Sequence, residues 1–373
     1  MMQTLSDGDA PVQRRHFLRT LGLMGAATAG LAALEPSSAL AFELSELETK
    51  LHEVGGAGVK FNIAIGSALV HNTGEKNTAI GEGAFEANTS GAFNVAVGTE
   101  ALKSNTTGQN SVAVGYLALA SNETGQATAV GAHAMQSNTT GAFNTAVGIG
   151  ALEKNTTGEW STAIGYHALK ASTGEKDTAV GAQALKENTT GFKNTAVGWS
   201  AMGSNLEGAM CTAIGMEALA SQRTGEKNTA LGYAALAENE TGSENVAVGN
   251  LALGNNHVGE AVNNGKAAKN VAVGVAAGAR NSGEGNVFLG CRAGEKEEGS
   301  HLLYIASSST TEPLIWGNFS SKELRLYTTK LGFYGVTPVA RHGAIAEPAE
   351  TLASLKAFAN TVREVLKNIG ITE

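Results

Sequence analysis

Small and apolar residues recur in a fixed order along the middle of the chain, spaced 15 to 17 residues apart in nearly every unit. The unit reads Asn-Thr-Ala-Val-Gly-x-x-Ala-Leu-x-x-Asn-Thr-Thr-Gly-x-x. Because this period is too short for a pair of helices, each unit is predicted to form one coil of an all-β solenoid. The glycine that ends the apolar run, here called the anchor glycine, occurs fourteen times, at Gly66, Gly81, Gly98, Gly115, Gly131, Gly148, Gly165, Gly181, Gly198, Gly215, Gly232, Gly249, Gly274 and Gly290.

The three residues before each anchor glycine are predicted to form a strand. The position directly before the glycine holds Val, Ile or Leu, and the position two residues earlier holds Thr, Val or Ile. Residues two apart share one face of a strand, so these pairs, such as Val95 and Val97, are predicted to fill the coil. The residue between them is Ala in thirteen units and Phe288 in the last. We expect this small column to face another backbone, either the returning strand of its own coil or, as we favour, a neighbouring subunit.

The rest of each unit is predicted to form a second short strand and a turn. An Ala followed by Leu, Met or Phe, as at Leu102, marks the second strand in most units. The Asn-Thr-Thr-Gly segments that begin at Asn105, Asn138 and Asn155 have turn chemistry, because Asn bonds its own backbone and Gly accepts a positive φ. We assign residues 59–294 to this rod of about fourteen coils.

The first 41 residues differ in composition from the rod. Arg14, Arg15, Phe17 and Leu18 precede an Ala/Gly/Leu stretch that runs to Leu34, and Ala-Leu-Ala follows at residues 39–41, before Phe42. The segment resembles a twin-arginine signal peptide, and the alternative is an arginine-flanked membrane-anchoring helix. We therefore expect an exported protein, periplasmic, at the cell surface or extracellular, without a membrane span in the mature chain.

Both ends of the rod carry segments that are predicted to cap it or to join subunits. Residues 42–58 are predicted to form a short amphipathic helix, residues 295–335 a small β cap or neck, and residues 336–373 a linker and an amphipathic helix. The terminal helix has apolar residues at coiled-coil spacing, which we predict to mediate trimerisation: Leu352, Leu355, Ala359, Val362, Leu366 and Ile369. The alternative is that these residues pack on their own chain.

Composition and charge narrow the functional classes. The 373 residues include 48 glycines and only 5% aromatic residues, and the net charge of −8 with no basic stripe argues against nucleic acid as a partner. Beyond residue 41 the only aspartate is Asp177, and His133 and His167 lie two coils apart. We therefore expect no enzymatic activity, no metal and no cofactor. Cys211 and Cys291 lie four coils apart, or about 19 Å, so they are predicted to be buried free thiols, with intermolecular pairing as the alternative.

Two sets of aromatic residues recur at fixed places in the repeat. Tyr116, Tyr166, Trp199 and Tyr233 each follow an anchor glycine, whereas Phe93, Phe143 and Trp160 each precede one by five residues. Such rings are typical of surfaces that hold sugars or proteins, so the first set is our candidate ligand surface. The alternative is that both sets pack between subunits. A minor alternative is ice binding by threonines of the turns, which include Thr107, Thr124, Thr140, Thr157, Thr173 and Thr190.

The repeated Asn-Thr-Ala-Val-Gly units over about residues 60–290 resemble the head repeats of trimeric autotransporter adhesins of the YadA-like kind. That resemblance implies a left-handed parallel β-roll, a homotrimer and binding to host surfaces, so we expect a fibrous adhesin whose partners are itself and a surface glycan or extracellular protein. The period here is mostly 17 residues, longer than the family unit. The segment from Leu331 to Ala340 with the terminal helix is similar to C-terminal modules of phage tail fibres, which implies a receptor-binding or polysaccharide-depolymerising component as the alternative function.

Overall fold

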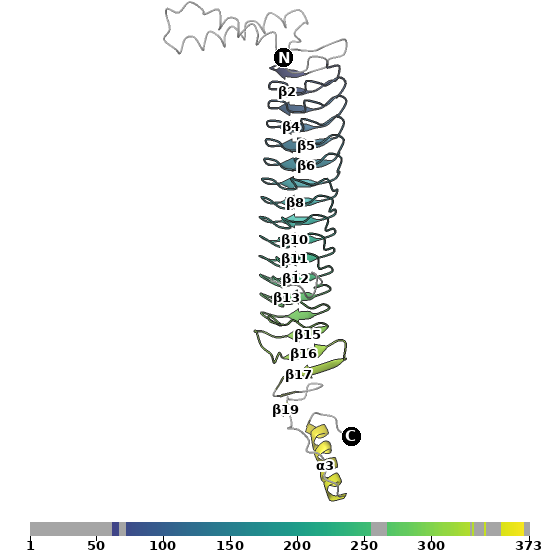
Figure 1. Cartoon of the computed structure of the whole chain (residues 1–373), viewed down its shortest axis with the longest axis vertical. Coiled ribbons are helices and arrows are strands. Elements are labelled where there is room, and N and C mark those ends of the chain that lie inside the picture. The colour runs from purple at the N-terminus through teal and green to yellow at the C-terminus, as the bar shows by residue number, and fades with distance from the viewer. Residues whose placement is uncertain are drawn as a thin grey trace, which may run out of the picture. The chain divides into compact units, whose positions relative to one another are not determined.

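A computed structural model describes residues 62–66, 72–254, 267–328, 330–331, 339–340 and 352–368. Its main feature is a stack of short parallel strands in which each strand pairs with the next one along the chain, in the order seen in Figure 1. These strands are β1 (Ile63–Ile65), β2 (Thr78–Ile80), β3 (Val95–Val97), β4 (Val112–Val114), β5 (Ala127–Val130), β6 (Asn144–Val147), β7 (Thr162–Ile164), β8 (Thr178–Val180), β9 (Thr195–Val197), β10 (Thr212–Ile214), β11 (Thr229–Leu231), β12 (Val246–Val248), β13 (Val271–Val273), β14 (Val287–Leu289) and β15 (Leu302–Ile305). The predicted β-solenoid is confirmed.

Equivalent positions of the repeat lie directly above one another. In the pairing of β6 with β7, Thr145 lies beside Thr162, Ala146 beside Ala163 and Val147 beside Ile164. Each position of the repeat therefore forms a continuous column along the stack, with about 4.8 Å between neighbouring coils. A chemical property of one repeat position becomes a property of a whole surface.

The prediction of which strand residues face the interior was wrong. In β6 the side chain of Ala146 is fully buried (0% exposed), whereas that of Val147 is 37% exposed. The same pattern holds in β3, where Ala96 is buried and Val95 and Val97 are half-buried. The alanine column therefore lines the coil's own interior, with the buried Leu or Met of the returning segment in the same core cluster, and it does not face a neighbouring subunit.

The returning segment is a series of turns, so the prediction of a second strand was also wrong. Leu102 has a φ of 51° and Glu100 a φ of 58°, values in the left-handed region. The Leu102 side chain is fully buried, and its N–H donates to the carbonyl of Ala118 in the next coil (3.0 Å). Burial and bonds between coils thus hold a backbone conformation that leucine rarely adopts.

Two buried columns of asparagine run beside the alanine column. One holds the turn residues, such as Asn105, whose side-chain Nδ2 donates to the Gly108 carbonyl (3.2 Å) and to Asn88 Oδ1 in the preceding coil (3.3 Å). The other holds the residue before each strand, such as Asn94, whose Nδ2 donates to the same Gly108 carbonyl (2.8 Å). The predicted turn role of asparagine is confirmed at Asn105, and the same side chains link one coil to the next.

The solenoid ends in an antiparallel segment. β16 (Ile315–Asn318) pairs antiparallel with β15, and β17 (Glu323–Leu326) pairs antiparallel with β16. A separate pair is formed by β18 (Lys330–Leu331) and β19 (Val339–Ala340), and α3 (Leu352–Asn368) is a helix of 17 residues. Within the described residues no helix is both long and apolar enough to cross a membrane. The predicted signal peptide (residues 1–41), the predicted helix over 42–58 and Ile369 lie outside the described residues.

Candidate binding face

The outward side of the parallel sheet is built from residues that alternate with buried ones. In the coil that ends at Gly165, Trp160, Ile164 and Tyr166 are exposed, whereas Ser161 and Ala163 are buried. Because alternate residues of a strand point to opposite sides, the columns three and one residues before the anchor glycine point outward. Exposed side chains five residues before the glycine, such as Trp160, and directly after it, such as Tyr166, form two further outward columns. We call these four columns the outer face.

The two central columns of the outer face contain no charged residue from β1 to β15. The column directly before the anchor glycine holds only Val, Ile and Leu, and many of these side chains are substantially exposed, among them Ile65, Val130, Ile164, Leu231 and Leu289. The column two residues earlier holds Thr as well as Val, Ile and Leu. At about 4.8 Å per strand, this uncharged strip runs for roughly 67 Å along the rod. Leu324 and Leu326 of β17, which lie in register with Gly317 and Ile315, extend it into the antiparallel end.

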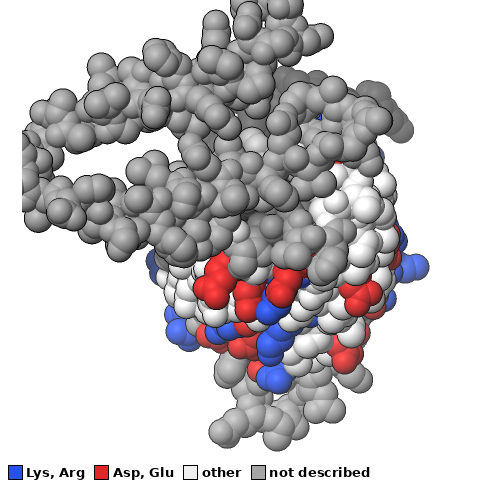
Figure 2. Space-filling model, turned by 90° about the horizontal axis from the view of Figure 1, so that it is seen from above, with Lys and Arg blue, Asp and Glu red and all other residues white. Residues whose placement is uncertain are grey.

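Charged side chains lie elsewhere on the coils. Seen from above in Figure 2, Lys and Arg are interspersed with Asp and Glu on the visible described surface. Several ion pairs join neighbouring coils, such as Lys170 with Glu153 (3.3 Å) and Lys103 with Glu86 (4.0 Å). Exposed pairs of this kind contribute little to stability. The lack of charge in the two central columns is therefore a property of one face and not of the whole rod.

The four residues of the candidate ligand surface all lie in one outer column, the one that follows the anchor glycine. Their exposed fractions are 51% for Tyr116, 49% for Tyr166, 48% for Trp199 and 42% for Tyr233. They follow β4, β7, β9 and β11, so neighbouring members lie two or three strands apart, or about 10 to 14 Å. The sequence therefore located one shared column, with rings too far apart to stack on one another.

Two of these rings pack on histidines. Tyr116 meets the His133 ring edge-on, with 5.2 Å between centroids, and Tyr166 stacks on His167 at 3.8 Å. Burial, followed by the charge of Lys170, lowers the pKa of His167. The neutral imidazole is thereby favoured, which suits an uncharged ring stack. The histidines thus support the aromatic column, and they do not form a metal site: within the described ranges, His, Cys, Asp and Glu form no group of three or more that could hold a metal ion.

The aromatic residues five positions before the anchor glycine form the opposite border of the outer face. Phe143 and Trp160 belong to neighbouring coils and stack at 4.3 Å with 21° between their planes, and Lys76 lies 4.9 Å from the centre of the Phe93 ring. Stacking between coils covers one face of each ring in the Phe143–Trp160 pair. These side chains therefore stiffen the stack more than they offer flat surfaces to a ligand.

The two cysteines differ in their surroundings. Cys211 occupies the column before the strand, is buried and accepts a contact from Gln222 Nε2 (3.0 Å), and burial raises the pKa of its thiol. Cys291 follows the last anchor glycine and therefore points outward, where it is exposed. The prediction of a buried thiol is confirmed for Cys211 and wrong for Cys291. Neither residue forms a disulfide within the chain.

The helix α3 carries the residues predicted to mediate trimerisation. In the single chain Ala359 and Leu366 are exposed and Val362 is half-buried. Leu352 and Leu355 also belong to the helix and lie in its first turn. Ala359 and Leu366 are therefore available to a partner, and the role of the whole set in assembly stays a prediction.

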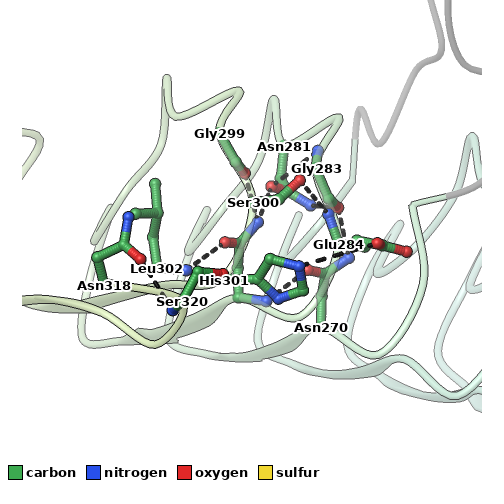
Figure 3. A network of polar contacts seen from close by, with 11 residues as sticks. Asn270, Asn281, Gly283, Glu284, Gly299, Ser300, His301, Leu302, Asn318 and Ser320 are labelled. Carbon is green, nitrogen blue, oxygen red and sulfur yellow. Dashed lines mark hydrogen bonds and ion pairs between the residues drawn. The ribbon is translucent and has the colours of Figure 1, made fainter. Parts of the chain in front are cut away.

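The buried amide column before the strands is a structural feature that the sequence analysis did not predict. The residue four positions before the anchor glycine is Asn in most coils, and Figure 3 shows the lower end of the column around Asn270 together with the turn residue Asn281. There the backbone N–H of Gly283 donates to Asn281 Oδ1 (3.3 Å), and the N–H of His301 donates to the Glu284 carbonyl (2.8 Å). The recurrence of Asn at this position was the signal that could have revealed the column.

No protein-family model matches the chain, and no curated protein matches it either.

Proposed function

We propose that this chain is an exported, non-enzymatic fibrous module that assembles as a homotrimer and presents a repetitive surface to a glycan or an extracellular protein, in the manner of an adhesin. The observation that carries the proposal is the charge-free strip formed by the two central columns of the outer face, one of which holds only Val, Ile and Leu. Large exposed apolar patches are typical of interaction sites and are uncommon on isolated soluble proteins.

A second copy of the chain is the occupant that fits this strip best. The strip is as long as the rod, and every coil contributes the same two side-chain positions to it. Identical chains aligned side by side would therefore bury the strip along its whole length. Pairing of this kind would remove side chains such as Val147 and Ile164 from water. The number three comes from the resemblance of the repeats to trimeric adhesin heads and from the coiled-coil spacing in α3.

The aromatic column lies at the edge of the outer face, beside the strip. Rings of Tyr166, Trp199 and Tyr233 recur there at nearly equal intervals, and such rings combine apolar area with a polar atom that can bond a ligand. A ligand that contacts several coils at once gains avidity from many weak contacts, without a deep pocket. This column is the surface on which we expect a glycan or protein to bind.

The assembly is tested with a double substitution in the strip, Val147→Lys with Ile164→Lys. Light scattering should report three chains for the unaltered protein and one for the variant, because six buried lysines in a trimer lack partners. Glu153→Lys, on the charged side of a nearby coil, is the matched control and should leave the mass unchanged. A single chain in the unaltered protein would refute the trimer.

Binding is tested with the combined variant Tyr116→Ala, Tyr166→Ala, Trp199→Ala and Tyr233→Ala on arrays of surface glycans and matrix proteins. The variant should lose attachment while its circular-dichroism spectrum and its mass stay unchanged. Full attachment by the variant would place the ligand elsewhere on the rod. Loss of the trimer would show that the column packs between subunits.

A further inference from the structure

One position of the buried amide column holds an acid. We call the side chain that each coil contributes to this column a rung. In a regular coil, Asn144 uses both ends of its amide: its Nδ2 donates to the Gly158 carbonyl (2.7 Å), and its Oδ1 accepts from the backbone N–H of Ser161 in the next coil (2.8 Å). Asn194 repeats the first bond with the Gly208 carbonyl (2.8 Å). Each asparagine of the column therefore supplies one acceptor and one donor on the same side chain.

Asp177 occupies this position in the coil between Ser161 and Asn194. Its Oδ1 accepts from the backbone N–H of Asn194 (2.8 Å), as an asparagine would. Its Oδ2 lies where the amide nitrogen would donate, and it accepts instead from Asn188 Nδ2 (3.0 Å). By the same 14-residue offset as in the regular coils, the acceptor in this coil is the Gly191 carbonyl, which keeps the bond from Asn188 Nδ2 (3.0 Å) but lacks the second donor that the Gly158 and Gly208 carbonyls have. A carboxylate has no hydrogen to give to this carbonyl, whereas the neutral acid has one.

The surroundings of Asp177 contain polar but uncharged groups. The residue is 0% exposed, and its backbone N–H donates to Ser161 Oγ (3.3 Å). Ser161 and Asn194 lie in the coils on either side, and Asn188 is in the facing turn. The charged group that acts on the carboxyl is Glu175, of like sign, which itself pairs with Lys176 (2.8 Å) at the exposed turn. A buried carboxylate here lacks a cationic partner among the described residues.

The neighbouring turn column is interrupted at the same height. Ser172 stands where other coils have Asn, and it accepts from Asn188 Nδ2 (3.3 Å). Because serine lacks the amide, Asn155 Oδ1 in the coil before it is buried without a hydrogen-bond partner. The coils around Asp177 are therefore short of donors, which favours a side chain that brings its own proton.

We propose that Asp177 is a proton-binding rung: in the folded rod its carboxyl is the neutral acid, it donates in the place of the missing amide, and release of the proton weakens the coils around it. Burial raises the pKa of this carboxyl to about 7, against the lowering effect of the bonds from Asn194 and Asn188. An unfolded aspartate titrates near pH 4. The stability that the proton supplies is therefore complete below about pH 4 and is lost as the pH rises through about 7.

The protonation state can be read directly, because the full chain has only three aspartates, Asp7, Asp9 and Asp177. We would label the aspartate carboxyls with carbon-13 and record isotope-edited infrared spectra of the full chain from about pH 3 to pH 9. A band of the neutral acid that is absent in Asp177→Asn should persist to about pH 6 and disappear with a midpoint near 7. A midpoint near 4 for that band would overturn the proposal.

The stability effect is read by thermal unfolding of the full chain and of Asp177→Asn. At about pH 8 the variant should melt several degrees higher than the unaltered chain, and at about pH 4 the difference should vanish. Asn144→Asp, which adds a second acid rung in a regular coil, should melt lower than the unaltered chain at pH 8 and approach it at pH 4. Equal pH dependence in the unaltered chain and in Asp177→Asn would refute the proposal.

A metal ion is the competing occupant of a buried carboxylate. Sodium or calcium chloride could stabilise the unaltered chain at pH 8 where choline chloride does not, with no such effect in Asp177→Asn. That result would show that a metal cation, and not a proton, is the occupant of this site. Equal response to the three salts supports the proton. None of these measurements depends on the proposed adhesive function, because each reads the rod itself.

Discussion

The interior of the coil and its outer face are made from the same strands but follow opposite rules. From each strand the interior receives alanine, which lies in one core with buried Leu, Met or Phe of the returning segments and beside the asparagine amides, whereas the outer face holds the larger β-branched side chains of the strands. In a globular protein the larger apolar residues would be expected inside. Here the large apolar residues of the interior, such as Leu102 and Met135, come from the returning segment, and each strand adds only a small side chain to the same core. The comparison teaches that in a slender solenoid the apolar surplus points outward, where another chain can cover it.

The largest effect is expected from placing a larger side chain in the interior of the coil. Ala146→Leu adds three carbons to a fully enclosed position, so it should cost about 3 kcal/mol, the upper end of the usual range for overpacking. Guanidinium unfolding followed by circular dichroism measures the loss. Val147→Leu, one residue away on the outer face, is the control and should change the free energy of unfolding by less than about 0.5 kcal/mol in the isolated chain. An unfolding curve unchanged by Ala146→Leu would contradict the assignment of the two faces.

A smaller effect is expected from removing one buried amide. Asn194→Ala takes away one of two donors to the Gly208 carbonyl (2.8 Å), which keeps Asn205 Nδ2, and the acceptor for the N–H of Cys211 (3.0 Å). Leaving such groups unsatisfied should destabilise the rod by about 1 to 3 kcal/mol. Hydrogen exchange measured by mass spectrometry should show faster exchange of backbone amides in the coils next to residue 194 than in the other coils. Uniform exchange along the rod would argue that the column has no local role.

The aromatic column should matter little for the stability of the single chain. Trp199→Ala removes a ring that is about half exposed, so the free energy of unfolding should fall by no more than about 1 kcal/mol. The same denaturant titration measures it, with Leu185→Ala, a fully buried residue of the same coil region, as the contrasting variant at about 2 to 5 kcal/mol. Similar losses in the two variants would remove the distinction between core and surface at these positions.

The smallest effect is expected from the charged sides of the coils. Lys103→Ala breaks the pair with Glu100 (2.8 Å), an exposed contact within one turn. Such pairs contribute about 0 to 1 kcal/mol, and less at high salt. Thermal unfolding at low and at high sodium chloride should give nearly equal midpoints for the variant and the unaltered chain. A large salt-dependent loss would show that ion pairs between coils, and not the interior columns, hold the stack.

Several features of the molecule could be predicted from the sequence because they depend on local chemistry. The regular recurrence of Gly66 to Gly290 determined the solenoid, since a repeat of one coil buries its interior only by stacking on its neighbours. Asn105 and its equivalents determined the turns, since Asn and Gly accept the backbone conformations required there. The shared column of Tyr116, Tyr166, Trp199 and Tyr233 also followed from spacing alone.

Other features depended on the tertiary structure. Alternation in Val95-Ala96-Val97 defines two faces but does not say which is inside, and only the width of the closed coil placed Ala96 in the core. The positive φ of Leu102, which replaced the predicted second strand, is held by a bond to Ala118 of the next coil and has no local signature. Likewise, only the stacking of the coils shows that Asp177 lies in a column of buried amides. Local spacing determines what repeats, whereas the contacts between coils determine which way each side chain points.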